Sequence, residues 1–294
     1  MPGFLGSQHS FQKGFVKPIK DGDEESLEYL RSRVKPFILR RTKTEVMSEL
    51  PPKVENVYYS SLVGEQMELY SALAKKLKEQ VLQTVDEKGI AASQMSILDA
   101  LLKLRQICCH PRLLKLNMPG VNNNLPSGKF EAFKDLATNI IEDGHKVLVF
   151  SQFVQMLKII RSWLNMKKIP HAYLDGSSKD RPEQVDMFNN DPNVPIFLIS
   201  LKAGGTGVNL TAADYVIHYD PWWNPAVENQ ATDRTHRIGQ TKQVFSYKMI
   251  CENTVEEKIL NLQEQKKGVA EAVIPGQNAW KTLTRDDLEM LFEV

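Results

Sequence analysis

The sequence contains little cysteine and no long hydrophobic run, and each absence excludes a class of protein. It has three cysteines in 294 residues, two of them adjacent (Cys108 and Cys109), which excludes a disulfide scaffold. The longest apolar runs, such as residues 147–150, fall far short of the ~18 residues of a membrane span. Residues 1–6 lack the basic start and apolar core of a signal peptide. We therefore expect a protein of a reducing intracellular compartment, with no membrane partner.

An excess of charge of one sign is also absent. Lys and Arg number 37 against 36 Asp and Glu, a formal net charge of +1, which argues against a histone-like polycation. Hydrophobic residues make up 42% of the chain and charged residues 25%, as in a globular protein and unlike a disordered or collagen-like chain. A local basic groove is still compatible with this balance, and the length allows about two domains.

Helical periodicity dominates residues 64–107. Apolar side chains recur there at spacings of three and four residues, as on one face of a helix. The two stripes consist of Tyr70, Leu73 and Leu77, and of Ile97, Leu101, Leu104 and Cys108. Because residues 88–89 separate the stripes, we predict an antiparallel helical hairpin or a small bundle. Residues 108–110 lack the ligand spacing of a structural zinc site, so we predict no metal site.

The character of the sequence changes after residue 128. Five short apolar segments alternate with helical patterns, which predicts a parallel sheet covered by helices on both faces. The predicted strands are residues 146–150, 172–174, 196–200, 215–219 and 244–250, and the predicted helices are residues 130–142, 153–166, 181–190 and 225–238. We therefore predict an α/β fold whose ligands bind at the carboxyl ends of the strands.

Polar, glycine-rich and aromatic residues follow four of these strands. Residues 151–152 and 175–178 are suited to ligand contact, but equally to capping a helix or turning the chain. Residues 202–207 combine a lysine, three glycines and a threonine, whose N–H and hydroxyl groups can face phosphate oxygens. The adjacent tryptophans 222–223 suit either packing over the sheet edge or contact with nucleic acid.

The helix predicted after the tryptophans carries the strongest signal. Gln230, Arg234 and Arg237 stand at i, i+4 and i+7, so they project from one face of a helix that Gly239 ends. Two arginines on one face beside a glycine-rich loop form a fork suited to phosphate oxygens. The alternative is a surface stripe paired with acids, since Asp233 stands four residues before Arg237.

Together these segments resemble the second RecA-like lobe of helicase superfamily two. More narrowly, the sequence is similar to the SWI/SNF-type chromatin-remodelling ATPases and their bacterial relatives. Six blocks carry the resemblance in the family's order: residues 5–19, 36–55, 104–111, 147–153, 173–178 and 200–240. The resemblance implies a RecA-like α/β lobe, a parallel sheet with helices on both faces, that carries an α-helical insertion.

The resemblance also implies roles for individual residues. Arg234 and Arg237 would be arginine fingers on ATP, aided by Gln230, and such a finger can contribute ~10³–10⁵ in rate. The nucleotide side of the cleft would be lined by Gly205 and Gly207. Double-stranded DNA would be contacted by Ser151, Gly176, Lys202, Thr206 and Trp223.

One departure from the family pattern limits what this chain can do alone. The first lobe of such motors carries Gly-x-x-x-x-Gly-Lys-Ser/Thr, but here Gly128 and Lys129 are followed by Phe130, and Asn123 stands where the first glycine belongs. Neither acidic run of the first half follows an apolar strand, as a magnesium motif would. We therefore expect ATP and Mg²⁺ to be held mainly by a first lobe of the same protein, with this chain inactive as an ATPase by itself.

The resemblance divides the chain into four segments. They are 1–45, the tail of the first lobe and a linker; 46–128, the helical insertion; 129–250, the second lobe; and 251–294, a brace helix and a terminal helix. The leading hypothesis is a monomeric, ATP-dependent double-stranded DNA translocase, at the nucleoid of a bacterium or in the nucleus of a eukaryote. Two alternatives stay open: a strand-separating RNA or DNA helicase, and a noncatalytic module that binds DNA or protein.

Overall fold

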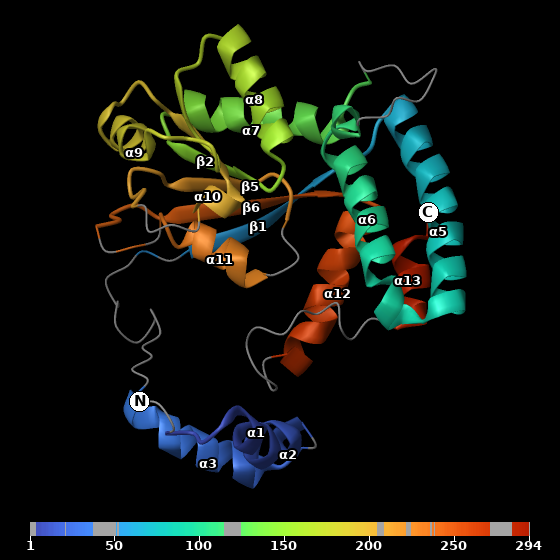
Figure 1. The fold of residues 1–294 in the computed structure, drawn as a ribbon. Helices are drawn as coiled ribbons and strands as arrows, with labels where there is room; N and C mark the ends of the chain where they lie inside the picture. Colours follow the sequence, from blue (N-terminus) through green and yellow to red (C-terminus); the bar gives the residue numbers. More distant parts are fainter. Residues whose placement is uncertain are drawn as a thin grey trace. The chain divides into compact units, whose positions relative to one another are not determined.

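The computed structural model places the described chain in two units, residues 1–49 and residues 50–294 (Figure 1). The described residues are 4–20, 22–37, 51, 53–114, 125–204, 209–221, 225–235, 237, 239–270 and 284–293. Among these residues no helix is both long enough and apolar enough to cross a membrane.

The first unit is helical and holds a small aromatic cluster. Helix α3 (Glu24–Val34) follows Asp23, whose carboxylate accepts the backbone N–H group of Ser26 at 3.2 Å. Phe15 is buried and stacks on Tyr29, with 6.1 Å between the ring centroids. The shorter elements are α1 (Gln8–Phe11), the π-helical turn η1 (Gln12–Val16), α2 (Lys17–Lys20) and the 3-10 turn η2 (Lys35–Phe37).

The second unit is built on a sheet of six described strands, all parallel, in the order β1-β6-β5-β2-β4-β3. The strands are β1 (Lys53–Ser60), β2 (Val147–Ser151), β3 (His171–Leu174), β4 (Ile196–Ser200), β5 (Tyr215–His218) and β6 (Val244–Cys251). The predicted α/β class is confirmed, and β2 to β6 lie where the apolar segments predict strands.

Helices cover both faces of the sheet (Figure 1). One face carries α7 (Gly128–Glu142) and α8 (Val154–Met166), and the other carries α9 (Arg181–Asn190), α10 (Leu201–Gly204) and α11 (Pro225–Thr232). Successive side chains of a strand point to opposite faces. In β2, therefore, Val147 and Val149 pack with α7 and α8, while Leu148 and Phe150 pack in the core of the other face. Burial on both faces explains why these strands are continuous apolar runs.

Strand β1 is an edge strand that the sequence patterns do not reveal. It pairs in parallel with β6, with Lys53 opposite Val244 and Ser60 opposite Cys251. Three of its central residues are exposed, and no other described strand pairs with its outer edge. Charged residues such as Lys53 and Glu55 are common on edge strands, where they discourage pairing with other chains, and they conceal the strand in the sequence.

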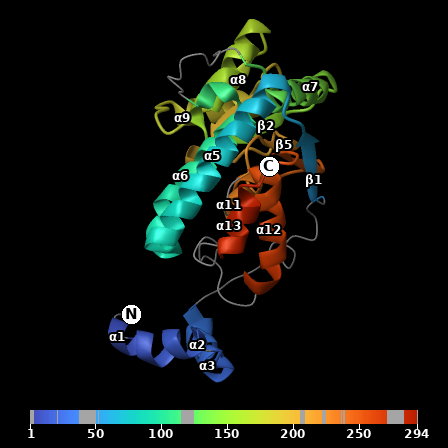
Figure 2. The ribbon, with the colours of Figure 1, turned by 90° about the vertical axis from the view of Figure 1, so that its right-hand side faces the viewer.

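Four described helices form a bundle beside the sheet (Figure 2). They are α5 (Gly64–Lys88), α6 (Ile90–Cys109), α12 (Val255–Ala270) and α13 (Arg285–Leu291). The predicted hairpin of α5 and α6 is confirmed, and its apolar stripes share one core with Val255, Ile259 and Leu291. The hydroxyl of Tyr70 accepts the backbone N–H group of Val255 at 2.7 Å, so α5 caps the first turn of α12.

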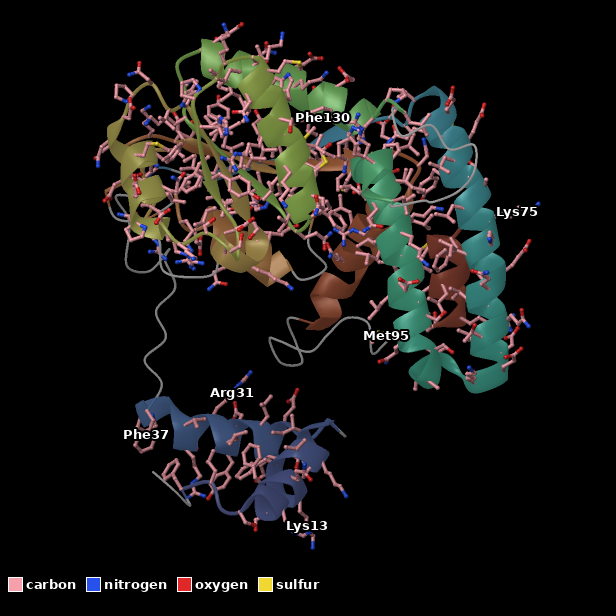
Figure 3. The ribbon with its side chains drawn as sticks, turned by 45° about the horizontal axis from the view of Figure 1, so that its top comes forward. Lys13, Arg31, Phe37, Lys75, Met95 and Phe130 are labelled. Carbon is pink, nitrogen blue, oxygen red and sulfur yellow. The ribbon has the colours of Figure 1, made fainter. Side chains whose placement is uncertain are left out.

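The outer surface of the hairpin is open to solvent. Figure 3 shows Lys75 on α5 and Met95 on α6 directed away from the bundle core. Met95 is 81% exposed, and Lys75 is also exposed. The helices thus bury one face each, as the spacing of their apolar residues predicts.

The carboxyl end of α6 is buried against the sheet lobe. The last carbonyl groups of a helix have no partner within it, so a buried helix end needs donors from elsewhere. Gln66 of α5 donates to the carbonyl of Ile107 at 2.8 Å. Both Ser127 and Tyr219 donate to the carbonyl of Cys109, at 3.0 and 2.8 Å. One helix end therefore joins the bundle, α7 and the end of β5.

Gly128, the first residue of α7, lies against the segment that follows β1. A Cβ atom at this position would lie 2.0 Å from the carbonyl oxygen of Ser61. The backbone N–H group of Gly128 donates to the side chain of Gln66 at 3.0 Å. Close packing, rather than phosphate binding, thus accounts for this glycine.

We predict that Gly128→Ala lowers the free energy of unfolding by about 3 kcal/mol, because the new methyl group meets a backbone oxygen that cannot move without shifting β1. Gly176→Ala is the control, since no atom lies within 4 Å of a Cβ there, and it should change stability by less than about 1 kcal/mol. Urea unfolding of the two variants measures both values. Equal stability of the two variants would contradict the packing argument.

Candidate functional site

The candidate site lies at the carboxyl edge of four neighbouring strands, β3, β4, β2 and β5. Ser151 ends β2 and lies opposite Ser200 of β4, and Phe150 lies opposite His218 of β5. Gly176 follows β3, and Lys202 lies in the short helix after β4; both are exposed. The structure therefore brings the predicted DNA residues Ser151, Gly176 and Lys202 to one edge of the sheet. Gly205, Thr206, Gly207 and Trp223, also predicted, lie outside the described residues.

Ser151 is fully buried, and its hydroxyl is engaged within the protein. The hydroxyl is hydrogen-bonded to the carboxylate of Asp220 and accepts the backbone N–H group of Phe153 at 3.0 Å. In this conformation the hydrogen bonds of Ser151 stabilise the turn between β2 and α8. A DNA phosphate is within reach of Ser151 only if this turn opens.

Asp220 is the centre of the contacts between the ends of β2 and β5. Besides Ser151, its carboxylate accepts the backbone N–H group of Gln152 at 3.1 Å and lies 3.9 Å from the guanidinium of Arg105. Burial raises the pKa of Asp220 to about 6, although Arg105 and the hydrogen bonds act in the opposite direction. The sequence patterns do not reveal a role for Asp220, because an aspartate directly before a proline is also typical of an ordinary turn.

Arg105 is a second residue that the sequence analysis missed. It lies on α6, 1% exposed, and donates to the carbonyl of Pro221 directly before the tryptophan pair. The signal that could have revealed Arg105 is its position next to Leu104 on an apolar helix. A buried arginine needs charged or hydrogen-bonding partners, so an arginine there indicates a buried contact. A buried ion pair between Arg105 and Asp220 thus links α6 of the helical insertion to the end of β5.

Lys129 belongs to the structural core and not to a phosphate loop. Its ammonium group pairs with the carboxylate of Glu256 and donates to the carbonyl of Met249 at 3.0 Å. Burial lowers the pKa of Lys129, but the charge of Glu256 and the neighbouring cysteine side chains together outweigh burial, so the pKa lies above its ordinary value. Lys129 therefore stays charged and joins α7 to the first turn of α12.

The helix after the tryptophans is shorter than the sequence predicts. The expected helix over 225–238 is wrong in its second half, because α11 ends at Thr232. The backbone N–H group and the hydroxyl of Thr235 both donate to the carbonyl of Thr232, at 3.0 and 2.7 Å. A side-chain hydroxyl that competes for backbone partners favours a tight turn over a further helical turn.

Consequently Gln230, Arg234 and Arg237 do not share a helix face. Gln230 is exposed on α11, whereas Arg234 is 4% exposed and Arg237 is half-buried. The backbone carbonyl of Arg234 accepts the N–H group of Leu210 at 3.2 Å, which ties the turn to the segment after the glycine-rich loop. Burial and the neighbouring charge of Arg237 lower the pKa of Arg234. The two guanidinium groups are thus close enough to repel each other.

Gln240 holds this arginine-bearing turn in place. Its side-chain amide donates to the carbonyls of Thr211, Ala213 and Thr235, at 3.1, 2.8 and 3.3 Å. The side-chain oxygen accepts the N–H group of Lys242 at 2.9 Å. Gln240 is nearly buried, so these contacts are protected from water. The sequence patterns do not reveal the role of Gln240. Its partners lie up to 29 residues away, and contacts over that distance leave no local pattern.

The described strand ends do not fit Mg²⁺. Two carboxylates lie there, Asp175 and Asp220, and both are occupied by protein donors. Hydrogen bonds from Ser177 lower the pKa of Asp175 and hold its carboxylate in the turn after β3. Mg²⁺ requires carboxylate oxygens that are free to coordinate, so Asp175 and Asp220, as the structure describes them, offer it no such pair.

This architecture, a parallel sheet with helices on both faces and two arginines directly after α11, defines a RecA-like lobe. The chain matches the family described as helicase conserved C-terminal domain over residues 128–239, and the SNF2-related domain over residues 1–113. It is 40% identical to an uncharacterized ATP-dependent helicase of Mycoplasma genitalium, over 100% of this chain and 27% of that relative.

Two solved structures from Sulfolobus solfataricus are also similar. The SWI2/SNF2 ATPase core in complex with dsDNA shares 37% identity at a TM-score of 0.67, over 100% of this chain and 62% of that one. The SWI2/SNF2 ATPase C-terminal domain shares 34% identity at a TM-score of 0.63, over 82% of this chain and 98% of that one. The chain therefore belongs to the SWI2/SNF2 ATPases of helicase superfamily two, and it contains the carboxyl-terminal lobe of their motor domain.

We predict that Asp220 titrates near pH 6 in the folded chain. Its folded pKa of about 6 exceeds the ordinary 3.8, so between these values the folded chain holds a proton that the unfolded chain has lost. The contribution of Asp220 to the free energy of unfolding is therefore complete below pH 4, and it is lost as the pH rises through 6. The difference in unfolding free energy, wild type minus Asp220→Asn, should fall by about 3 kcal/mol from pH 4 to pH 7.

Urea unfolding across this pH range measures that difference, and carbon-13 NMR of the carboxyl group gives the midpoint. Arg105 and Lys129 are the cations whose charges act on this carboxylate. A difference in unfolding free energy that does not vary with pH would show that burial does not control this group.

Proposed function

We propose that this chain is the second motor lobe of an ATP-dependent double-stranded DNA translocase. The observation that carries the proposal is the pair Arg234 and Arg237, which follow α11 and lie close enough for the charge of Arg237 to act on Arg234. An anion between the two guanidinium groups relieves their repulsion, and a nucleotide phosphate has the required charge and size. We assign Gln230, Gly205 and Gly207 to the same nucleotide side.

The arginines act on the charge of the transferred phosphoryl group. Hydrolysis of ATP spreads negative charge over the oxygens of the γ-phosphate, and a guanidinium group in place before reaction stabilises that charge. Gln240 and the contact between Leu210 and Arg234 limit the motion of this turn. The arginines are therefore supplied in a fixed geometry, with little reorganisation during the reaction.

The remainder of the nucleotide site belongs to a first lobe in this proposal. Gly128 and Lys129 have packing roles, and the strand-end carboxylates are occupied. A partner lobe of the same protein would thus supply the phosphate loop and the ligands of Mg²⁺, a cation that neutralises the triphosphate when bound. This chain spans 27% of its Mycoplasma relative, which leaves ample room for such a lobe there.

Duplex DNA is the proposed substrate of the carboxyl edge. Exposed Gly176 and Lys202 follow the adjacent strands β3 and β4, so they can contact one phosphate backbone. The similar Sulfolobus core was solved in complex with dsDNA, which supports a duplex over a separated strand. We assign Thr206 and Trp223 to this side, together with Ser151 once its turn opens.

We predict that Arg234→Ala or Arg237→Ala, in the complete two-lobe protein, lowers DNA-stimulated ATP turnover by about 10³-fold. Phosphate release measures turnover, and fluorescence anisotropy should show DNA binding retained, since these side chains face the nucleotide in the proposal. Exposed Arg161→Ala on α8 is the control and should keep wild-type turnover. Unchanged turnover in both finger variants, or DNA-stimulated phosphate release by the 294-residue chain alone, would contradict the proposal.

We predict that Trp223→Ala uncouples hydrolysis from movement in the complete protein. Loss of the aromatic contact should leave ATP turnover within about threefold of wild type while triplex displacement falls about tenfold, since one stacking contact is worth ~1–3 kcal/mol. Met166→Ala, which changes an exposed apolar side chain at the end of α8, is the control. Normal coupling in Trp223→Ala would remove the DNA role of this residue, and unwinding of a blunt duplex would favour a strand-separating helicase.

A further inference from the structure

The last turn of α11 is attached to the sheet at two points. The imidazole Nε2 of His218, the last residue of β5, lies 2.9 Å from the hydroxyl oxygen of Thr232, the last residue of α11. One helical turn earlier, the carboxylate of Glu228 pairs at 3.0 Å with the ammonium group of Lys248 on β6, which lies opposite His218 in the sheet. Residues four apart share one face of a helix, so this face of α11 is held against two adjacent strands.

The contact between His218 and Thr232 is protected from water. The two residues are only 1% and 2% exposed. The ring of His218 also stacks on the ring of Phe150 in β2, with 5.6 Å between the ring centroids. A buried ring that is stacked on a neighbour has little freedom to turn, so this contact fixes where α11 ends.

The imidazole of His218 donates this hydrogen bond. Among the described residues, the buried Nδ1 atom of the ring has no hydrogen-bond partner. A buried N–H group without an acceptor is rare in proteins, so the proton lies on Nε2 and is donated to Thr232. Burial lowers the pKa of His218 to about 4, although the charge of Glu228 acts in the opposite direction. The ring is therefore neutral near pH 7, with one N–H group to donate.

The arginine-bearing turn begins at this contact. The carbonyl of Thr232 accepts the N–H group and the hydroxyl of Thr235, where the helix gives way to the turn. The carbonyl of Thr235 accepts the N–H group of Arg237 at 3.1 Å. The guanidinium Nε of Arg237 donates to the carbonyl of Asp233 at 3.0 Å. Consecutive hydrogen bonds thus connect Thr232 to Arg237, which is half-buried and so still open to a ligand.

We propose that His218 is a positioning residue for the arginines of the nucleotide site, an inference that rests on the proposed function. Its N–H group fixes Thr232 at the end of β5, and so fixes the point from which the chain turns toward Arg234 and Arg237. Gln240 holds the same turn from its other side. The imidazole acts only through the helix end, and a displacement of about 1 Å at a reacting group can cost about 10²-fold in rate.

The test measures ATP turnover of the complete two-lobe protein as a function of duplex DNA concentration. We expect His218→Leu, which removes the N–H donor, to lower kcat about tenfold, with the KM for DNA within about twofold of wild type. His218→Gln keeps an amide donor, so its kcat should lie between those of His218→Leu and wild type. Thr232→Val nearly keeps the shape of the side chain but loses the acceptor, so it should lower kcat as much as His218→Leu.

A double variant separates positioning from a general loss of stability. If the two side chains act through their contact, His218→Leu combined with Thr232→Val should lower kcat no more than either change alone. Thr84→Val on α5 is the matched control, because it removes the same hydroxyl group from a helix of the bundle. The hydroxyl of Thr84 donates to the carbonyl of Gln80 in its own helix, so kcat should equal that of wild type.

Circular dichroism shows which variants fold, and Thr232→Val carries the test if His218→Leu does not fold. A wild-type kcat in Thr232→Val would overturn the positioning role, as would additive losses in the double variant or a rise in the KM for DNA alone. Failure of Thr232→Val to fold would also overturn it, because the contact would then serve the fold itself. Wild-type turnover in both Arg234→Ala and Arg237→Ala would instead contradict the proposed function.

Discussion

The buried carboxyl end of α6 is the constraint on which the rest of the second unit depends. A helix that ends inside a protein exposes carbonyl groups that cost free energy unless donors reach them. Gln66, Ser127 and Tyr219 supply these donors from three different elements. Satisfying one helix end therefore fixes the bundle, the start of α7 and the end of β5 with respect to each other.

Two buried ion pairs reinforce this junction: one joins a helix to the strand ends, and the other joins two helices. Arg105 and Asp220 link α6 to the site, while Lys129 and Glu256 link α7 to α12. Buried ion pairs add little net stability, since desolvation offsets most of their attraction. Their geometry is nevertheless specific, because a buried charge is tolerated only when its oppositely charged partner lies beside it. These pairs therefore define one arrangement of bundle and sheet.

The sequence predicts much of the fold and less of the site. Strands β2 and β4 are visible because they are buried on both faces and are apolar runs, whereas β1 is hidden by Lys53 and Glu55 on an exposed edge. The end of α11 depends on the hydroxyl of Thr235, a local competition that apolar spacing does not report. Gln240 and Arg105 act on residues distant in the sequence, and such contacts leave no periodic signal.

The pairing of β1 with β6 has a consequence for how the chain folds. Ser60 and Ile250 meet in the finished sheet although 190 residues separate them. Contacts of such long range form slowly, because the entropy of closing the intervening chain is lost before the contact stabilises it. During synthesis β1 therefore leaves the ribosome long before its partner strand exists. We therefore expect β1 to join the sheet after the central strands have paired.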